Sequence, residues 1–139
     1  MAFIKAVDLK GFDDQAECLE QMFAELAGVL DGDKLEALKE AVYLREDTAS
    51  TYLEGGLAAP HGRIDGLKNE IVVIGVSKDG VDWPESGKKA HLIFLIGVDR
   101  KSVASYLSLL QKIIKWKKGY AGNLSQATAE QILRDIKML

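Results

Sequence analysis

The chain has 139 residues, 47% of them hydrophobic, and a formal net charge of −3 from 18 basic and 21 acidic side chains. This length and apolar content predict a single globular domain over residues 1–139, large enough to bury a core. The acidic balance argues against nucleic-acid binding, which needs a basic surface, and the single Cys18 excludes an internal disulfide and a thiolate metal cluster. No apolar run approaches the roughly 20 residues of a membrane span, and the first residues lack the apolar core of a signal peptide, so we predict a cytoplasmic protein without membrane insertion.

The first half of the chain predicts a strand followed by a helical hairpin. Residues 3–9 are compatible with a short strand, and apolar residues at helical spacing then run from Ala16 to Leu30. Asp31-Gly32-Asp33 breaks this pattern, and Asp33 with Glu36 resembles a capping pair for a second helix. The apolar residues that we expect on the inner side of that helix are Leu35, Leu38, Val42 and Leu44.

The middle of the chain predicts strands. Residues 62–69 are polar and read as a loop or a short edge strand, whereas 70–76 is the strongest strand signal and is expected to be buried on both faces. Residues 78–80 read as a turn and 81–83 as a short strand. Residues 90–98 form a second buried strand in this prediction.

The rest of the chain predicts two helices. The first has an apolar side that includes Tyr106, Leu107 and Ile113, and the second begins at a capping box of Thr128 and Gln131. Strand, two helices, several strands and two helices predict a mixed α/β fold, with a β-sheet covered by helices on both sides.

The segment 45–62 combines residues suited to chemistry. Gly55-Gly56 permits backbone conformations closed to other residues, and Pro60 restricts the chain just before His61. A histidine on a small rigid turn indicates presentation to a partner, although a structural histidine fits the local sequence almost as well. His91 begins an apolar strand, where we expect a structural role.

An anion site is the second feature of this segment. Arg45 supplies a permanent cation, and Ser50 and Thr51 supply hydroxyl donors; together with backbone N–H groups near the glycine pair they could hold an anion. The carboxylates show no paired pattern, and we predict neither a cofactor nor a metal site.

The same segment resembles a known family. Arg45-Glu46, then Ser50-Thr51, then residues 55–62 ending in Pro-His-Gly, resemble the active-site segment of phosphotransferase-system enzyme IIA domains of the fructose, mannitol and nitrogen-regulatory type (type 2). The resemblance extends loosely over nearly the whole chain.

This resemblance implies a phosphocarrier. Members take a phosphoryl group from the phosphorylated carrier protein HPr onto a histidine and pass it to a IIB domain. By the match, His61 is the phosphorylated nucleophile, Arg45 stabilises the phosphoryl group, Ser50 or Thr51 donates a hydrogen bond to it, and Glu46 orients Arg45 or the local backbone. A neutral histidine ring nitrogen is a suitable nucleophile near pH 7.

One position departs from the family pattern. Many members carry a second histidine at the start of the helix after the inner strand, and Tyr106 stands at that position here. Its hydroxyl can donate a hydrogen bond but cannot supply a cationic ring.

Three hypotheses follow from the sequence. The first is a IIA component of fructose- or mannitol-type sugar uptake, with an HPr-like donor and a IIB acceptor. The second is a stand-alone regulatory phosphocarrier of the nitrogen type, which acts through a regulatory protein. The third is an interaction module that keeps the fold without phosphoryl transfer; His61 and Arg45 count against it and Tyr106 counts for it.

Overall fold

The structure, a computed structural model, describes residues 3–10 and 14–139. Within these residues the chain forms a six-stranded sheet and four α-helices. The strands are β1 (Phe3–Leu9), β2 (Tyr52–Leu53), β3 (Leu57–Ala58), β4 (His61–Ile64), β5 (Ile71–Trp83) and β6 (Lys88–Asp99). The helices are α1 (Gln15–Ala24), α2 (Gly32–Thr48), α3 (Val103–Gly119) and α4 (Ala129–Lys137), with a 3-10 helix, η1 (Leu124–Gln126), before α4.

The sheet is mixed, in the order β1-β5-β6-β3-β2, and β4 also pairs with β6. β5 and β6 form a long antiparallel hairpin at its centre, whereas β1 runs parallel to β5, and β3 and β4 run parallel to β6. β3 and β4 pair with β6 in one continuous register, although residues 59 and 60 separate the two strands. Leu57 pairs with Leu92 and His61 with Ile96. The segment that carries His61 is therefore anchored to the central hairpin.

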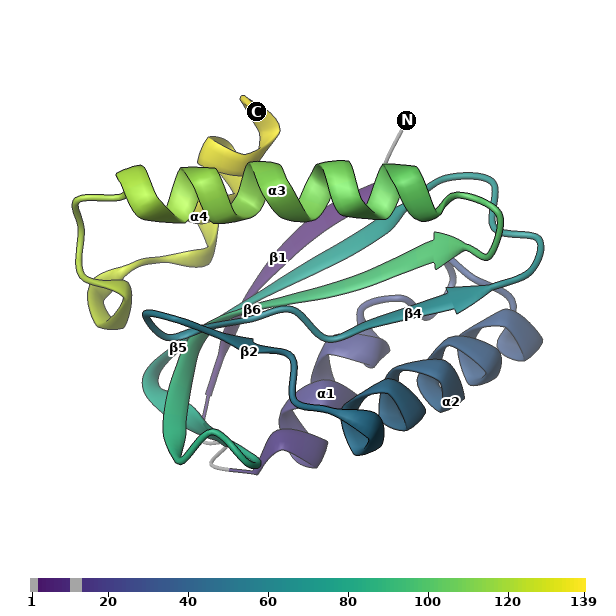
Figure 1. The fold of residues 1–139 in the computed structure, drawn as a ribbon, viewed down its shortest axis with the longest axis horizontal. Helices are drawn as coiled ribbons and strands as arrows, with labels where there is room; N and C mark the ends of the chain where they lie inside the picture. The colour runs from purple at the N-terminus through teal and green to yellow at the C-terminus, as the bar shows by residue number, and fades with distance from the viewer. Residues whose placement is uncertain (1–2, 11–13) are drawn as a thin grey trace.

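Helices cover both faces of this sheet, as the sequence predicts. Successive side chains of a strand point to opposite faces. On β5, Val73 packs in the cluster that contains residues of α1 and α2, while Ile74 packs in the cluster that contains residues of α3 and α4. Figure 1 shows α1 and α2 on one side of the sheet and α3 and α4 on the other. The unbroken run of apolar residues in β5 is explained by this burial on both faces.

The predicted turn at 78–80 is wrong. β5 continues through it to Trp83, and the register against β6 shifts between Val76 and Val81, which marks a bulge. The Gly80 N–H donates to the Ser77 hydroxyl across the bulge at 3.0 Å, and Gly80 has a φ of 83°. Because a bulge keeps the strand on the sheet, turn-forming residues here bend β5 without ending it.

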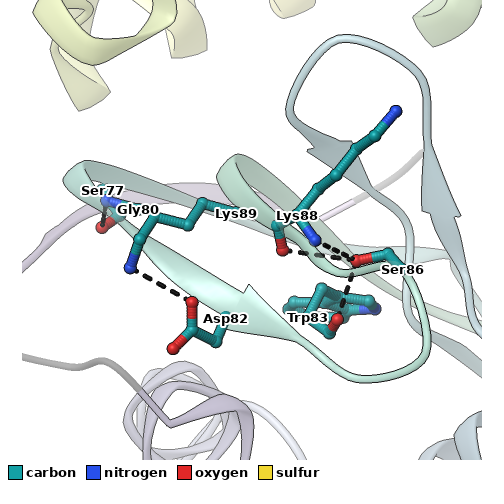
Figure 2. A network of polar contacts seen from close by, with 7 residues as sticks. All are labelled: Ser77, Gly80, Asp82, Trp83, Ser86, Lys88 and Lys89. Carbon is teal, nitrogen blue, oxygen red and sulfur yellow. Dashed lines mark hydrogen bonds and ion pairs between the residues drawn. The ribbon is translucent and has the colours of Figure 1, made fainter.

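The hairpin between β5 and β6 closes through Ser86. Its hydroxyl donates to the Trp83 carbonyl at 2.7 Å and accepts from the Lys88 N–H at 3.0 Å (Figure 2). Lys89 forms an ion pair with Asp82 across the two strands at 3.1 Å. These contacts tie the hairpin together at the end far from Ile71 and Gly97, which pair at the other end of β5.

Three expectations for the helices need correction. The N-cap of α2 is Asp31, not Asp33, because the Asp31 carboxylate accepts from the Lys34 N–H at 2.9 Å. Leu44 and Leu107 do not face inward: they are 69% and 51% exposed. Leu44 follows the buried Val42 by two residues, about 200° around the helix, and Leu107 is about 100° around from the buried Tyr106, so neither side chain shares the buried face. Thr128 caps α4 as predicted, accepting from the Gln131 N–H at 3.3 Å.

None of the helices in the described residues is long and apolar enough to span a membrane.

Candidate functional site

A groove of about 850 Å³ runs along α2 from Asp33 to Thr48 and is bordered by β4 and the first turns of α3. α2 contributes one wall with Ala41, Leu44 and Arg45, and α3 contributes Tyr106 and Leu107. β4 and the residues after it form the floor; these are His61, Gly62, Arg63, Ile64 and Asp65. The groove thus gathers residues from three segments that are far apart in the sequence.

β4 directs His61 toward α3 and Gly62 toward α2. A Cβ at Gly62 would lie 2.9 Å from the Ala41 Cβ and 3.2 Å from atoms of Leu38 and Val42, so α2 packs directly against the backbone there. Since neighbouring side chains of a strand alternate, His61 emerges on the other side. Its ring stacks on the Tyr106 ring, with centroids 4.4 Å apart and planes at 29°. The side chain is held between the strand and α3.

The contacts of Nδ1 favour one tautomer of His61. Its Nδ1 lies 3.0 Å from the Ala59 carbonyl oxygen and 3.0 Å from the Tyr106 hydroxyl oxygen. A carbonyl oxygen can only accept, which favours the neutral ring with its proton on Nδ1; the Tyr106 hydroxyl can donate or accept, and in this tautomer its oxygen accepts. The lone pair of the neutral ring is then on Nε2, the nitrogen of a nucleophile.

The surroundings of His61 favour its neutral form. Burial lowers the pKa of the imidazole below its ordinary 6.5, and the positive charges of Arg45 and Arg63 lower it further, while the bond to the Ala59 carbonyl acts in the opposite direction. Burial raises the pKa of the Tyr106 phenol, so it stays protonated at neutral pH. The site therefore combines a neutral nucleophile with nearby positive charge.

Two arginines act on the His61 ring, and only Arg45 was predicted. Arg45 lines the groove and its Nη1 donates to the Ala49 carbonyl at 2.6 Å, which holds the guanidinium at the end of α2. Arg63 lies two residues after His61 on the same strand, so both side chains share a face of β4. Arg63 was not predicted, because the sequence of residues 62–69 is compatible with either a loop or a short edge strand. Only in a strand do residues 61 and 63 point to the same face.

The predicted hydrogen-bond donors Ser50 and Thr51 do not line the groove. The Ser50 hydroxyl accepts from the Tyr52 N–H at 3.1 Å, and the Thr51 hydroxyl, in a side chain only 6% exposed, donates to the Glu46 carboxylate. A direct bond from either hydroxyl to a phosphoryl group on His61 finds no support in this arrangement. The Glu46 carboxylate accepts from the Thr51 hydroxyl and from the Gln15 amide, and these contacts tie it to the local structure.

His91 lies outside the groove, as its sequence context predicts. Its Nδ1 contacts the Ser77 carbonyl at 2.9 Å, and its backbone N–H donates to the Gly56 carbonyl at 2.8 Å. In the part of the chain that the structure describes, no three His, Cys, Asp or Glu side chains are grouped to hold a metal ion.

Comparison with known proteins decides the family. Residues 5–137 match the family described as phosphoenolpyruvate-dependent sugar phosphotransferase system, EIIA 2. The chain belongs to this family. The resemblance seen in segment 45–62 thus holds over nearly all of the sequence.

Curated relatives of this EIIA domain are longer proteins. It is 32% identical over 124 residues to the PTS system fructose-specific EIIABC component of Bacillus subtilis (strain 168), covering 84% of this chain and 20% of the relative. It is 30% identical over 131 residues to the multiphosphoryl transfer protein of Escherichia coli O157:H7, covering 90% of this chain and 33% of the relative. The chain therefore spans about a fifth and a third of the length of these two relatives.

Solved structures share the fold of this EIIA domain. The nitrogen regulatory protein IIA-Ntr of Neisseria meningitidis superposes with a TM-score of 0.76 at 23% identity, covering 95% of this chain and 91% of that one. A complex of enzyme IIAMTL and phosphorylated enzyme IIBMTL from Escherichia coli gives a TM-score of 0.72 at 18% identity, covering 97% and 94%. The predicted EIIA type 2 fold is confirmed by these likenesses.

Proposed function

We propose that the chain is a phosphocarrier that accepts a phosphoryl group from an HPr-like protein on Nε2 of His61 and passes it to a IIB domain in sugar uptake. The observation that carries this proposal is the 3.0 Å contact between His61 Nδ1 and the Ala59 carbonyl oxygen. This contact favours a proton on Nδ1 and leaves the Nε2 lone pair for the nucleophilic role. We propose that residues 1–139 act as one such domain, in the cytoplasm.

The transfer balances without moving a proton within the site. The Nε2 lone pair attacks the phosphorus, the Nε2–P bond forms, and the N–P bond of the donor phosphohistidine breaks. The donor ring leaves with that electron pair as a neutral imidazole, provided its other nitrogen is protonated. His61 keeps its Nδ1 proton and gains positive charge on the ring, which strengthens the bond to the Ala59 carbonyl.

Arg45 and Arg63 supply charge for the transferred group. Phosphoryl transfer depends mainly on positioning and on stabilising the outer phosphoryl oxygens, because the protein contributes little covalent chemistry. Both guanidinium groups are close enough to depress the pKa of His61, and Arg45 is additionally held by Ala49. We assign Arg63 part of the positive charge that a second histidine provides in many family members, since Tyr106 remains neutral.

The rim of the groove suits protein partners. Leu44 on α2 and Leu107 on α3 are both largely exposed, and both line the groove that holds His61. Exposed apolar side chains next to a reactive group indicate a surface that another protein covers. The fructose-specific relative favours fructose-type uptake, and the complex of enzyme IIAMTL with phosphorylated enzyme IIBMTL favours a IIB domain as acceptor.

The test is phosphorylation with phosphoenolpyruvate, enzyme I and HPr, followed by intact mass measurement. We expect one phosphoryl group on the wild-type chain and none on His61→Ala. A control IIA domain labelled in the same mixture shows that the donors are active. If the control is labelled and the wild-type chain is not, the chain is no phosphocarrier and the fold serves another role; if His61→Ala is still labelled, the nucleophile is a different residue.

Adding a IIB domain of the fructose type separates transport from regulation. Loss of the phosphoryl group from the chain and its gain by the IIB domain support sugar uptake. A chain that is phosphorylated but never discharged by fructose- or mannitol-type IIB domains would contradict the transport role and favour a regulatory phosphocarrier.

A further inference from the structure

A partly buried polar cluster of Gln15, Glu46 and Thr51 lies outside the groove that holds His61. Glu46, in the last turn of α2, accepts from the Thr51 hydroxyl and, at 3.1 Å, from the Gln15 amide of α1. Thr51 is only 6% exposed. A carboxylate that receives two side-chain donors holds both in place, so Glu46 joins the starts of α1 and β2 to the end of α2.

This cluster continues through the backbone to Ala59. The Thr51 carbonyl accepts the Ala59 N–H at 3.1 Å, next to the pairing of Tyr52 with Ala58. On its other side Ala59 is followed by Pro60, which restricts the residue before it to extended backbone, and the Pro60 carbonyl accepts the Ile96 N–H at 2.9 Å. Ala59 is therefore held from both directions.

The Ala59 carbonyl is the group that selects the His61 tautomer. It accepts from Nδ1 at 3.0 Å, and the partner of one ring nitrogen decides which nitrogen carries the proton. A small rotation of the Ala59 carbonyl away from Nδ1 would let the proton reside on Nε2, where it blocks the lone pair. The direction of that carbonyl thus matters for chemistry at the opposite nitrogen.

We propose that Glu46 and Thr51 are positioning residues, which hold Ala59 so that its carbonyl keeps His61 in the Nδ1–H tautomer. This inference rests on the proposed function for its kinetic consequence, the rate of phosphoryl acceptance. The tautomer itself is a property of the free protein and needs no donor. Gln15 of α1 donates to Glu46. Removing the Gln15 amide should therefore also increase the Nε2–H tautomer of His61, but by less than removing Glu46 or Thr51 does.

The direct test reads the tautomer of His61 from its ring ¹⁵N chemical shifts in the wild type and in four variants. Thr51→Val removes the hydroxyl at nearly constant shape, and Glu46→Gln leaves one acceptor oxygen for two donors. Thr51→Ser keeps the hydroxyl, and Asp47→Asn removes the exposed neighbouring carboxylate as a matched control for Glu46→Gln. We expect the Nε2–H form to increase in Thr51→Val and Glu46→Gln, and to stay at the wild-type level in Thr51→Ser and Asp47→Asn.

The titration of His61 distinguishes positioning from general loosening. The Ala59 carbonyl raises the pKa of the ring, and burial lowers it. Loss of the Ala59 contact alone therefore moves the midpoint down, whereas a loosened site that admits water moves it up. We expect a lower midpoint in Thr51→Val, which removes no charge. Glu46→Gln also loses a negative charge, which lowers the midpoint by itself, so its shift is read against that of Asp47→Asn.

The kinetic readout is the rate of phosphorylation by phospho-HPr. We expect Thr51→Val and Glu46→Gln to slow it roughly ten- to hundredfold through misplacement of the nucleophile, with little change in KM for HPr. An unchanged tautomer in folded Glu46→Gln, or a rate equal to that of Asp47→Asn, overturns the inference. If Thr51→Val does not fold, the inference is tested by comparing the tautomer and the rate of Glu46→Gln with those of Asp47→Asn. If the wild type is not phosphorylated, the proposed function fails while the tautomer measurement still tests the positioning.

Discussion

His61 works at the residue scale through its two ring nitrogens. Nδ1 is bound by the Ala59 carbonyl and lies beside the Tyr106 hydroxyl, so the two nitrogens have different surroundings. Burial and the two nearby arginines disfavour a proton on the second nitrogen. A histidine in these surroundings stays neutral and nucleophilic at a pH where a free histidine is partly charged.

The first residue-scale prediction concerns charge. We expect His61 to titrate below 6.5, its ordinary pKa, and Arg63→Gln to raise the midpoint because one positive charge is lost. NMR titration of the ring measures both values. A midpoint that does not move in Arg63→Gln would show that this guanidinium does not act on the ring.

The same depressed pKa has a consequence for stability. Below pH 6.5 the unfolded chain binds a proton at His61 that the folded chain resists, so this group lowers the free energy of unfolding as the pH falls from 6.5 toward the folded pKa. The variant His61→Gln has no titrating group at this position and should not lose stability in this way. Urea unfolding at several pH values measures the free energy of unfolding of both proteins. The difference between them should be constant above pH 6.5 and should shift in favour of the variant as the pH falls below 6.5.

A second residue-scale prediction concerns Tyr106. Tyr106→Phe keeps the ring that stacks on His61 and removes the hydroxyl, while the Ala59 carbonyl still accepts from Nδ1. We expect the rate of phosphoryl transfer to His61 to fall by no more than about tenfold, which corresponds to the free energy of about one ordinary hydrogen bond. A complete loss of transfer, measured by the same mass assay, would instead assign the hydroxyl an essential contact with the phosphoryl group.

At the scale of elements, β4 decides the geometry of the site. A strand places His61 and Arg63 on one face and Gly62 on the other, where α2 approaches the backbone. A loop with the same residues would not maintain this alternation. Gly62 is thus explained by helix packing, since it leaves room for Ala41.

The element-scale prediction is a pair of glycine substitutions. Gly62→Ala places a Cβ 2.9 Å from the Ala41 Cβ, and we expect it to cost about 1–3 kcal/mol of unfolding free energy and to shift β4. Gly32→Ala, at the start of α2 with no atom within 4 Å of the new Cβ, should be neutral or slightly stabilising. Thermal and urea unfolding measure the stability of both variants. Equal effects on stability would mean that α2 shifts to make room for the new Cβ at position 62.

At the scale of the whole molecule, apolar residues fall into two groups: those of the core on both faces of the sheet and those exposed at the groove. Ile74 is fully buried beneath α3 and α4, while Leu44 and Leu107 stand exposed at the groove. All three are large apolar residues. Their burial differs because Ile74 lies on a central strand covered by helices, whereas Leu44 and Leu107 are turned away from the buried faces of their helices.

This contrast predicts opposite effects of substitution. Ile74→Ala should cost about 2–5 kcal/mol in stability, because it leaves a cavity in the core. Leu44→Ala and Leu107→Ala should change stability by no more than about 0.5 kcal/mol, as expected for exposed sites, and should raise KM for the phosphoryl donor. Wild-type KM in the double variant Leu44→Ala/Leu107→Ala would contradict docking of the donor at this rim.

The sequence by itself determined the fold class, the buried strand segments 70–76 and 90–98, the pairs of helices and the segment 45–62 that carries His61 and Arg45. These follow from local signals: apolar periodicity, turn residues and a motif of fixed spacing. The tertiary structure decided which groups meet. Tyr106 reaches His61 across 45 residues, Arg63 joins them because 61–64 pairs with β6, and Thr51 contacts Glu46 and not the groove. Such contacts depend on strand pairing and on how helices pack against the strands, which no short window of sequence contains.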